Sequence, residues 1–240
     1  MKLTIAKNIN DLNQRFAEWL VSYIQKTLKE QNRFTIALSG GSTPKKLYSL
    51  LASNIFKNKI DWNKLHFFWG DERYVPFTDD RNNAKMTFDI LLNNVPVIKE
   101  QIHIIRTDIE PEVSAKDYEK LLRQYFPDKN HTFDLVLLGL GDNAHTLSLF
   151  PESSLIKEKE KWVSSFYLKK ENIYRITLTP PVVNASACVA FLVSGKSKSA
   201  ALYNVFNQQH EPMLYPAQII QPFNDELYWW VDEDAASMIK

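Results

Sequence analysis

Apolar residues recur at every third or fourth position near the start of the chain, and this spacing predicts an amphipathic helix. The series is Ile9, Leu12, Phe16, Trp19, Leu20, Tyr23, Ile24 and Leu28. A short strand over residues 3–6 is expected before it. The chain therefore opens with a strand followed by a long helix.

Further along, short continuous apolar runs alternate with segments of helical spacing. The runs predict strands at residues 34–38, 65–69, 101–105, 133–138, 188–193 and 227–231, and two more at 162–167 and 175–178. Helices are expected from Pro44 through 51, over 83–92 and 113–126, briefly after Gly141, and from about 198 through 206. Strands that are apolar along their length and separated by helices form a mostly parallel sheet covered on both faces. We expect one three-layer α/β/α domain over residues 1–240.

Glycine is scarce and its placement is informative. The chain has 6 glycines in 240 residues, where average usage would give about 17. Gly40, Gly41, Gly70, Gly139, Gly141 and Gly195 all follow the end of a predicted strand. Ligands of open α/β sheets bind outside those ends, so the glycines predict one site built from four loops.

Composition removes several classes of function. The net charge is +1 and no apolar run approaches a membrane span, so no nucleic-acid or membrane partner is expected. The only cysteine, Cys188, lies in an apolar run, which favours a reducing compartment and a cytoplasmic protein. No G-x-S-x-G elbow is present, so a serine hydrolase is not expected. No zinc-binding cluster is present either, so no metal is expected.

Two of the loops carry groups suited to an anion. In the first, Ser39, Gly40, Gly41, Ser42 and Thr43 precede Pro44, with Thr43 as the expected N-cap of a helix. The alternative is that this segment is only a tight turn followed by a helix N-cap, with no ligand. The second holds Asp71, Glu72 and Arg73 and leads to Asn83; Arg73 suits a phosphate or carboxylate, and a surface ion-pair cluster is the alternative.

The third loop reads Gly139-Leu140-Gly141-Asp142-Asn143-Ala144-His145 and the fourth holds Ser194, Gly195 and Lys198. The third matches G-x-G-x-x-G/A, but it lies mid-chain and Pro151 soon ends any helix, which argues against a dinucleotide site. We expect its glycines to let His145 project as a general base. Lys198, at a helix start, suits an anion.

Together these loops resemble the 6-phosphogluconolactonases of the pentose phosphate pathway. The resemblance rests on residues 39–44 (SGGSTP), 69–73 (WGDER) with Val75, Pro76 and Asn83, 139–151 (GLGDNAHTLSLFP), 175–179 (RITLT) with Asn184, and Ser194, Gly195 and Lys198. It spans residues 34–203 in order and spacing.

The resemblance implies a modified Rossmann-like sandwich of the sugar-phosphate isomerase/deaminase type. It also implies an enzyme that hydrolyses 6-phospho-D-glucono-1,5-lactone to 6-phosphogluconate without metal or cofactor. Apart from the resemblance, we expect a monomer or small homo-oligomer. His145 resembles the residue that activates water, and Arg73 and Lys198 resemble the phosphate or carboxylate contacts. The remaining motif residues are expected to line the substrate site: Ser39, Gly40, Gly41, Ser42, Thr43, Asp71, Asn83, Gly141 and Arg175.

One departure concerns the partner of the base. The family commonly carries aspartate two residues before the histidine, where this chain has Asn143. Asparagine accepts a hydrogen bond but does not offset imidazolium charge, and the adjacent Asp142 is an alternative partner.

Three other functions stay open. A glucosamine-6-phosphate deaminase of the same fold would carry a motif like Ala-Phe-Asn-Glu-Pro, where this chain reads Leu147-Ser148-Leu149-Phe150-Pro151 with no acid. The others are a non-catalytic sugar-phosphate binding protein, suggested by Asn143, and an NAD-dependent enzyme.

Overall fold

A seven-stranded parallel sheet forms the centre of the protein. The structure, a computed structural model, describes residues 1–128 and 131–239. The strand order is β1-β10-β9-β6-β2-β3-β5, with every neighbouring pair parallel. The strands are β1 (Lys2–Ala6), β2 (Phe34–Leu38), β3 (Leu65–Trp69), β5 (Ile102–His103), β6 (Leu135–Leu138), β9 (Val189–Val193) and β10 (Leu227–Asp232).

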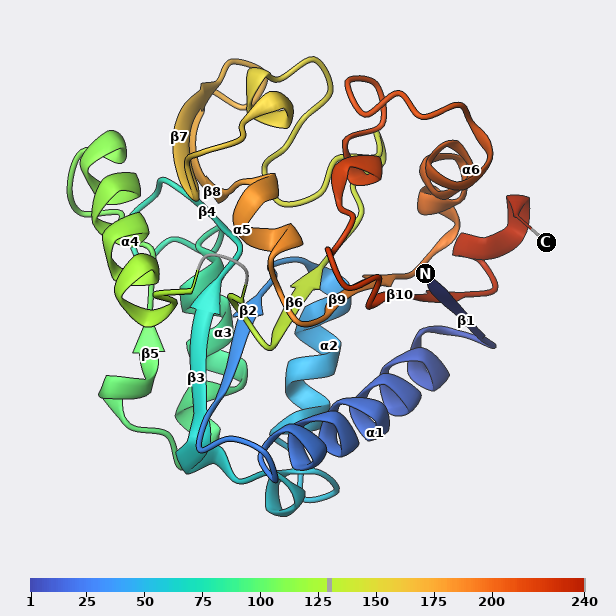
Figure 1. Ribbon diagram of the computed structural model, residues 1–240. Coiled ribbons are helices and arrows are strands. Elements are labelled where there is room, and N and C mark those ends of the chain that lie inside the picture. Colours follow the sequence, from blue (N-terminus) through green and yellow to red (C-terminus); the bar gives the residue numbers. More distant parts are fainter. Residues whose placement is uncertain (129–130, 240) are drawn as a thin grey trace.

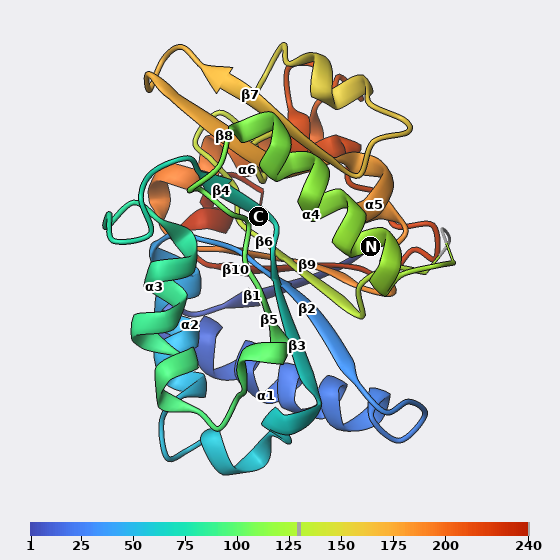
Figure 2. The ribbon, with the colours of Figure 1, turned by 90° about the vertical axis from the view of Figure 1, so that its left-hand side faces the viewer.

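Helices cover both faces of this sheet. They are α1 (Ile9–Thr27), α2 (Ser42–Leu51), α3 (Asn83–Ile90), α4 (Pro111–Tyr125), α5 (Pro180–Asn184) and α6 (Ser199–Asn207). Figure 2 shows α1, α2 and α3 on one side and α4, α5 and α6 on the other. The predicted three-layer α/β/α sandwich is confirmed.

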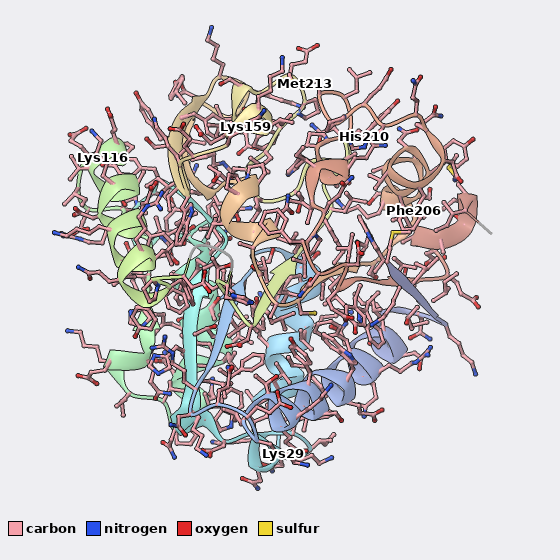
Figure 3. All side chains as sticks on the ribbon, in the orientation of Figure 1. Lys29, Lys116, Lys159, Phe206, His210 and Met213 are labelled. Carbon is pink, nitrogen blue, oxygen red and sulfur yellow. The ribbon has the colours of Figure 1, made fainter. Side chains whose placement is uncertain are left out.

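The central strands explain the apolar runs. Every residue of β2, β6 and β9 is buried, because helices lie over both faces of those strands. Charged side chains occupy the periphery, as Lys29 and Lys116 illustrate (Figure 3).

A second, smaller sheet was not predicted as such. β4 (Asp71–Arg73), β8 (Ile173–Leu178) and β7 (Val163–Leu168) form an antiparallel sheet in the order β4-β8-β7. It lies above the main sheet in the view of Figure 1. The strands expected at 162–167 and 175–178 are present as β7 and β8, although they belong to this sheet and not to the main one. Residues 71–73, which were expected in a loop, form β4, because this polar segment pairs with a strand about 100 residues away.

Gly70 is the junction of the two sheets. Its N–H donates to the Leu38 carbonyl in the main sheet at 2.9 Å, and its carbonyl accepts from Leu178 in the small sheet at 2.8 Å. A Cβ at this position would lie 2.6 Å from a methyl group of Leu147. Gly70 therefore lets the chain leave one sheet and enter the other without a side chain.

Three local predictions also need correction. Helix α2 begins at Ser42 with Gly41 as its N-cap, two residues before the expected cap Thr43. The short helix expected after Gly141 does not form, since Ala144 and Leu147 have positive φ angles of 61° and 54° and positive φ ends a helix. Helix α5 was missed, although Pro180 at its first position is a typical start signal.

Candidate active site

The loops that follow β2, β3, β6 and β9 converge on one pocket of about 280 Å³. The lining residues are Ser39, Gly40, Gly41, Asp71, Arg73, Asn83, Gly139, Leu140, Gly141, His145, Thr146, Leu147, Glu171, Arg175 and Lys198. Ten of the fourteen predicted site residues are among them. The other four, Ser42, Thr43, Asp142 and Asn143, are outside the lining set of the described residues. Ser42 and Asp142 directly follow a lining residue in the chain, and Thr43 and Asn143 lie two positions from one.

The His145 ring is held in one orientation by two neighbours. Its Nδ1 lies 2.5 Å from the Asn143 side-chain oxygen, and its face stacks on Phe150 with ring centroids 4.4 Å apart. An amide oxygen only accepts, so Nδ1 carries the proton and Nε2 of the neutral ring has the free electron pair. Burial lowers the pKa of His145 from 6.5 to about 4; Asp71 opposes this shift, and Lys198 and Arg175 add to it. The ring is therefore a neutral base at physiological pH.

Gly141 makes room for that ring. Its N–H donates to the His145 carbonyl at 2.8 Å, which closes a tight turn. A Cβ at Gly141 would lie 2.0 Å from His145 Nδ1. Gly139 has no such constraint, because the nearest atom to a Cβ there is Ser39 Oγ at 3.8 Å. Of the two glycines expected to aim His145, only Gly141 is required by contact.

A polar network beside His145 joins the small sheet to the segment that follows β6. Arg175, on β8, pairs with Glu171 at 2.5 Å and lies 3.9 Å from Asp71 on β4. Asp71 also accepts a 2.6 Å hydrogen bond from Ser148. Glu171 and Ser148 were missed by the sequence analysis. Glu171 lies in the turn between β7 and β8, and no pattern in the sequence indicates that this turn reaches the pocket.

A second network positions Arg73 and Asn83 at the start of α3. The buried Glu72 carboxylate accepts from the backbone N–H groups of Arg73, Asn83 and Ala84 at 2.7–2.8 Å. Burial raises the pKa of Glu72 to about 7, against the lowering effect of these bonds. The Asn83 amide donates to the Asp71 carbonyl at 2.9 Å. Glu72 thus orients two pocket residues without lining the pocket.

Arg73 differs from the other two cations of the pocket. Its NH1 donates to the Arg81 carbonyl at 2.8 Å, and its Nε is buried without a hydrogen-bond partner in the described part of the chain. Within residues 1–128 and 131–239 no carboxylate forms an ion pair with it. Arg175 and Lys198, in contrast, are each paired with carboxylates. Arg73 is therefore a guanidinium available to an incoming anion.

Lys198 stands at the start of α6, as the sequence predicted. It pairs at 2.5 Å with Asp142, which the sequence offered as an alternative partner for His145. The structure places Asp142 on Lys198 and Asn143 on His145.

The first loop presents a helix N-terminus to the pocket. Gly41 has a φ of 106°, a conformation that glycine adopts without strain. A Cβ on Gly40 would lie 1.9 Å from the Asn83 side chain, so the first two loops pack directly together. The first backbone N–H groups of α2 have no carbonyl partner within the helix and suit an anion.

Metal binding and dinucleotide binding both require arrangements of side chains or helices that can be looked for in the described residues. No three side chains of His, Cys, Asp or Glu in that part of the chain gather closely enough to hold a metal ion. No helix begins between residues 139 and 153, so the glycines of the third loop lack the helix that a dinucleotide pyrophosphate requires. In addition, no helix of residues 1–128 and 131–239 is long and apolar enough to cross a membrane.

Comparison with known proteins gives one consistent family. The model of glucosamine-6-phosphate isomerases/6-phosphogluconolactonase matches residues 7–229. A 6-phosphogluconolactonase of Nostoc is 40% identical over 227 residues, covering 93% of this chain and 92% of its own. A crystal structure described as devB protein has a TM-score of 0.92 at 30% identity, covering 100% of this chain and 99% of its own. The 6-phosphogluconolactonase structure from Trypanosoma brucei has a TM-score of 0.86 at 26% identity, covering 100% and 98%.

Proposed function

The chain belongs to the family of glucosamine-6-phosphate isomerases and 6-phosphogluconolactonases, and we propose that within it this protein is a lactonase. Its substrate is 6-phospho-D-glucono-1,5-lactone, its product is 6-phosphogluconate, and His145 activates the attacking water. The observation that carries this proposal is the His145 ring, with Nδ1 bonded to Asn143 and one face covered by Phe150.

The phosphate is held by cations and by backbone N–H groups at the pocket. Arg73 provides a guanidinium with no carboxylate partner in the described chain, and the N-terminus of α2 adds backbone N–H groups and the positive end of the helix dipole. Lys198, which lines the same pocket, completes the anion site. This arrangement favours a phosphorylated sugar over a neutral one.

The reaction then needs one base and one stabilised oxyanion. His145 Nε2 takes a proton from water while the water oxygen attacks the lactone carbonyl carbon, C1. The negative charge that develops on the carbonyl oxygen is stabilised by the nearby cations, since Lys198 and Arg175 line the same pocket as His145. The C1–O ring bond breaks as His145 returns the proton to the ring oxygen, which becomes a hydroxyl group.

Phe150 favours hydrolysis over deamination. It occupies the position at which the deaminase motif carries glutamate, and its ring stacks on His145. An apolar ring next to the base supplies no second acid for the proton transfers of an amino-sugar isomerisation. A binding protein without turnover is also less favoured. A neutral histidine with a free Nε2 can accept a proton from water, and binding alone does not need such a base.

The cellular setting is part of the proposal. The buried thiol Cys188 suits a reducing cytoplasm, and we propose a monomer or small homo-oligomer.

The test is a substrate comparison with the purified protein. Lactone hydrolysis is coupled to 6-phosphogluconate dehydrogenase and compared with the spontaneous rate, and ammonia release from glucosamine-6-phosphate is measured in parallel. We expect lactone hydrolysis well above the spontaneous rate and no ammonia. Ammonia release without lactonase activity would replace this proposal with the deaminase.

A further inference from the structure

One cation of the pocket is neutralised from outside it. Lys198 lines the pocket, whereas its partner Asp142 does not. The Lys198 side chain is 26% exposed and the Asp142 side chain 71% exposed. The acid therefore meets the ammonium group from the solvent side.

The backbone of Lys198 is anchored, whereas Asp142 has an exposed side chain that can turn into water. The Lys198 N–H donates to the Gly195 carbonyl at 3.0 Å, and the Gly195 N–H donates to the buried Asp232 carboxylate at 3.0 Å. Asp142 sits in the turn from Gly141 to His145, which is held by backbone hydrogen bonds and by the Asn143 side chain, not by the side chain of Asp142. Rotation of the Asp142 side chain into water leaves that turn, and the His145 backbone, in place.

The other two cations have different partners. Arg73 forms no ion pair within the described chain, and Arg175 pairs with Asp71 and Glu171, both of which line the pocket. Only Lys198, of these three, is held by a carboxylate that stands outside the lining set. An exposed carboxylate with one charge is a weak competitor for a phosphate, which carries close to two negative charges at neutral pH and is held by further donors.

We propose that Asp142 is a specificity-determining residue, an internal competitor that occupies Lys198 in the free enzyme and is displaced when a phosphate group binds. The identity of that anion rests on the proposed function. Asp142 lowers the affinity for phosphate-bearing ligands, including the product, and returns to Lys198 as the product leaves. When the pocket is empty, the positive charge of Lys198 is therefore balanced by the Asp142 carboxylate.

The test removes the competing charge. Asp142→Asn is expected to tighten binding of inorganic phosphate about fivefold, measured by calorimetry and as competitive inhibition of lactone hydrolysis. KM for the lactone is expected to fall by a similar factor. Asp142→Glu keeps the charge and is expected to bind phosphate as the wild type does. Asp108→Asn is the matched control, because it also removes one exposed, ion-paired carboxylate, and neither Asp108 nor its partner Arg106 lines the pocket.

The reverse outcome has a clear meaning. If Asp142 instead orients Lys198 for binding, Asp142→Asn weakens phosphate binding, and the inference is overturned; unchanged affinity overturns it as well. In a Lys198→Met background the Asp142→Asn effect is expected to vanish. Phosphate binding is scored independently of turnover, so a wild type that binds phosphate but does not hydrolyse the lactone contradicts the proposed function and leaves this inference standing.

Discussion

At the scale of single residues, burial and an uncharged partner determine the basicity of His145. Asn143 fixes the Nδ1–H tautomer through its amide oxygen but adds no negative charge. Burial is the largest influence on the ring and lowers its pKa to about 4. An aspartate at the same place would fix the same tautomer and also stabilise imidazolium. This chain therefore has a weaker base that stays deprotonated in mildly acidic solution.

Asn143→Asp tests that interpretation. A carboxylate next to the ring favours the protonated form, so the pKa of His145 rises and the acid limb of kcat/KM moves from near pH 4 to higher pH. We expect a shift of about one to two pH units. The measurement is the pH profile of lactone hydrolysis for both proteins. Superimposable acid limbs would show that Asn143 does not act on the proton affinity of His145.

Gly141→Ala tests the placement of the ring. The new Cβ would overlap His145 Nδ1, so the ring must leave its bond with Asn143, and we expect kcat/KM to fall about 100-fold or more with the fold retained. Gly139→Ala is the matched control, since its Cβ meets only ordinary van der Waals contacts. Circular dichroism checks folding in both variants. Equal activity of the two variants would contradict the role given to Gly141.

At the scale of elements, the sequence was informative where one strand or helix decides the outcome. The fully buried strands β2, β6 and β9 appear as apolar runs, and the glycines follow their ends as expected. β4 was missed because Asp71, Glu72 and Arg73 have no apolar pattern, and their pairing with β8 depends on the rest of the fold. Tertiary pairing overrides local propensity in such a segment.

Glu72→Gln tests how the small sheet holds the start of α3. The carboxylate accepts three backbone N–H bonds, and a glutamine would turn an N–H group towards at least one of those donors. We expect a loss of about 1–3 kcal/mol in the free energy of unfolding, measured with denaturant at pH 8, where Glu72 is ionised. Glu112→Gln is the control, because Glu112 is an exposed acid in the first turn of α4. Equal effects of both changes would remove Glu72 from this role.

At the scale of the whole molecule, the site depends on contacts between distant segments. Ser148 reaches Asp71 across 77 residues, and Lys198 reaches Asp142 across 56. The resemblance of the loop motifs identified which residues gather, but not which of them pair. Pairing follows from how the two sheets meet, and no spacing in the sequence encodes it.

The packing of α4 on the edge of the main sheet makes stability depend on pH. The Tyr125 hydroxyl of α4 lies 2.8 Å from His103 Nε2 and 3.2 Å from His66 Nδ1. Burial lowers the pKa of His66 and lowers that of His103 to about 4, with the Arg33 charge adding to both shifts. The unfolded chain, with ordinary histidines, binds protons first. These groups contribute stability that is present above pH 6.5 and is lost as the pH falls towards 4.

His103→Gln tests this dependence. The wild type is expected to lose on the order of 1 kcal/mol more than the variant between pH 6.5 and 4, since His103 is half-exposed and solvent screens part of the shift. The difference between the two proteins is the quantity to measure, by denaturant unfolding, because the raised pKa of Glu72 gives the opposite slope in the wild type and the variant alike. Parallel stability curves would contradict the role of His103.

The most direct test of the account is lactone hydrolysis by His145→Ala, coupled to 6-phosphogluconate dehydrogenase and compared with the wild type and with no enzyme. The wild type is expected to far exceed the spontaneous rate. The variant should lose most of that excess while it still binds inorganic phosphate, because the cations of the pocket are unchanged. Turnover by the variant close to that of the wild type would remove His145 as the base and contradict the mechanism.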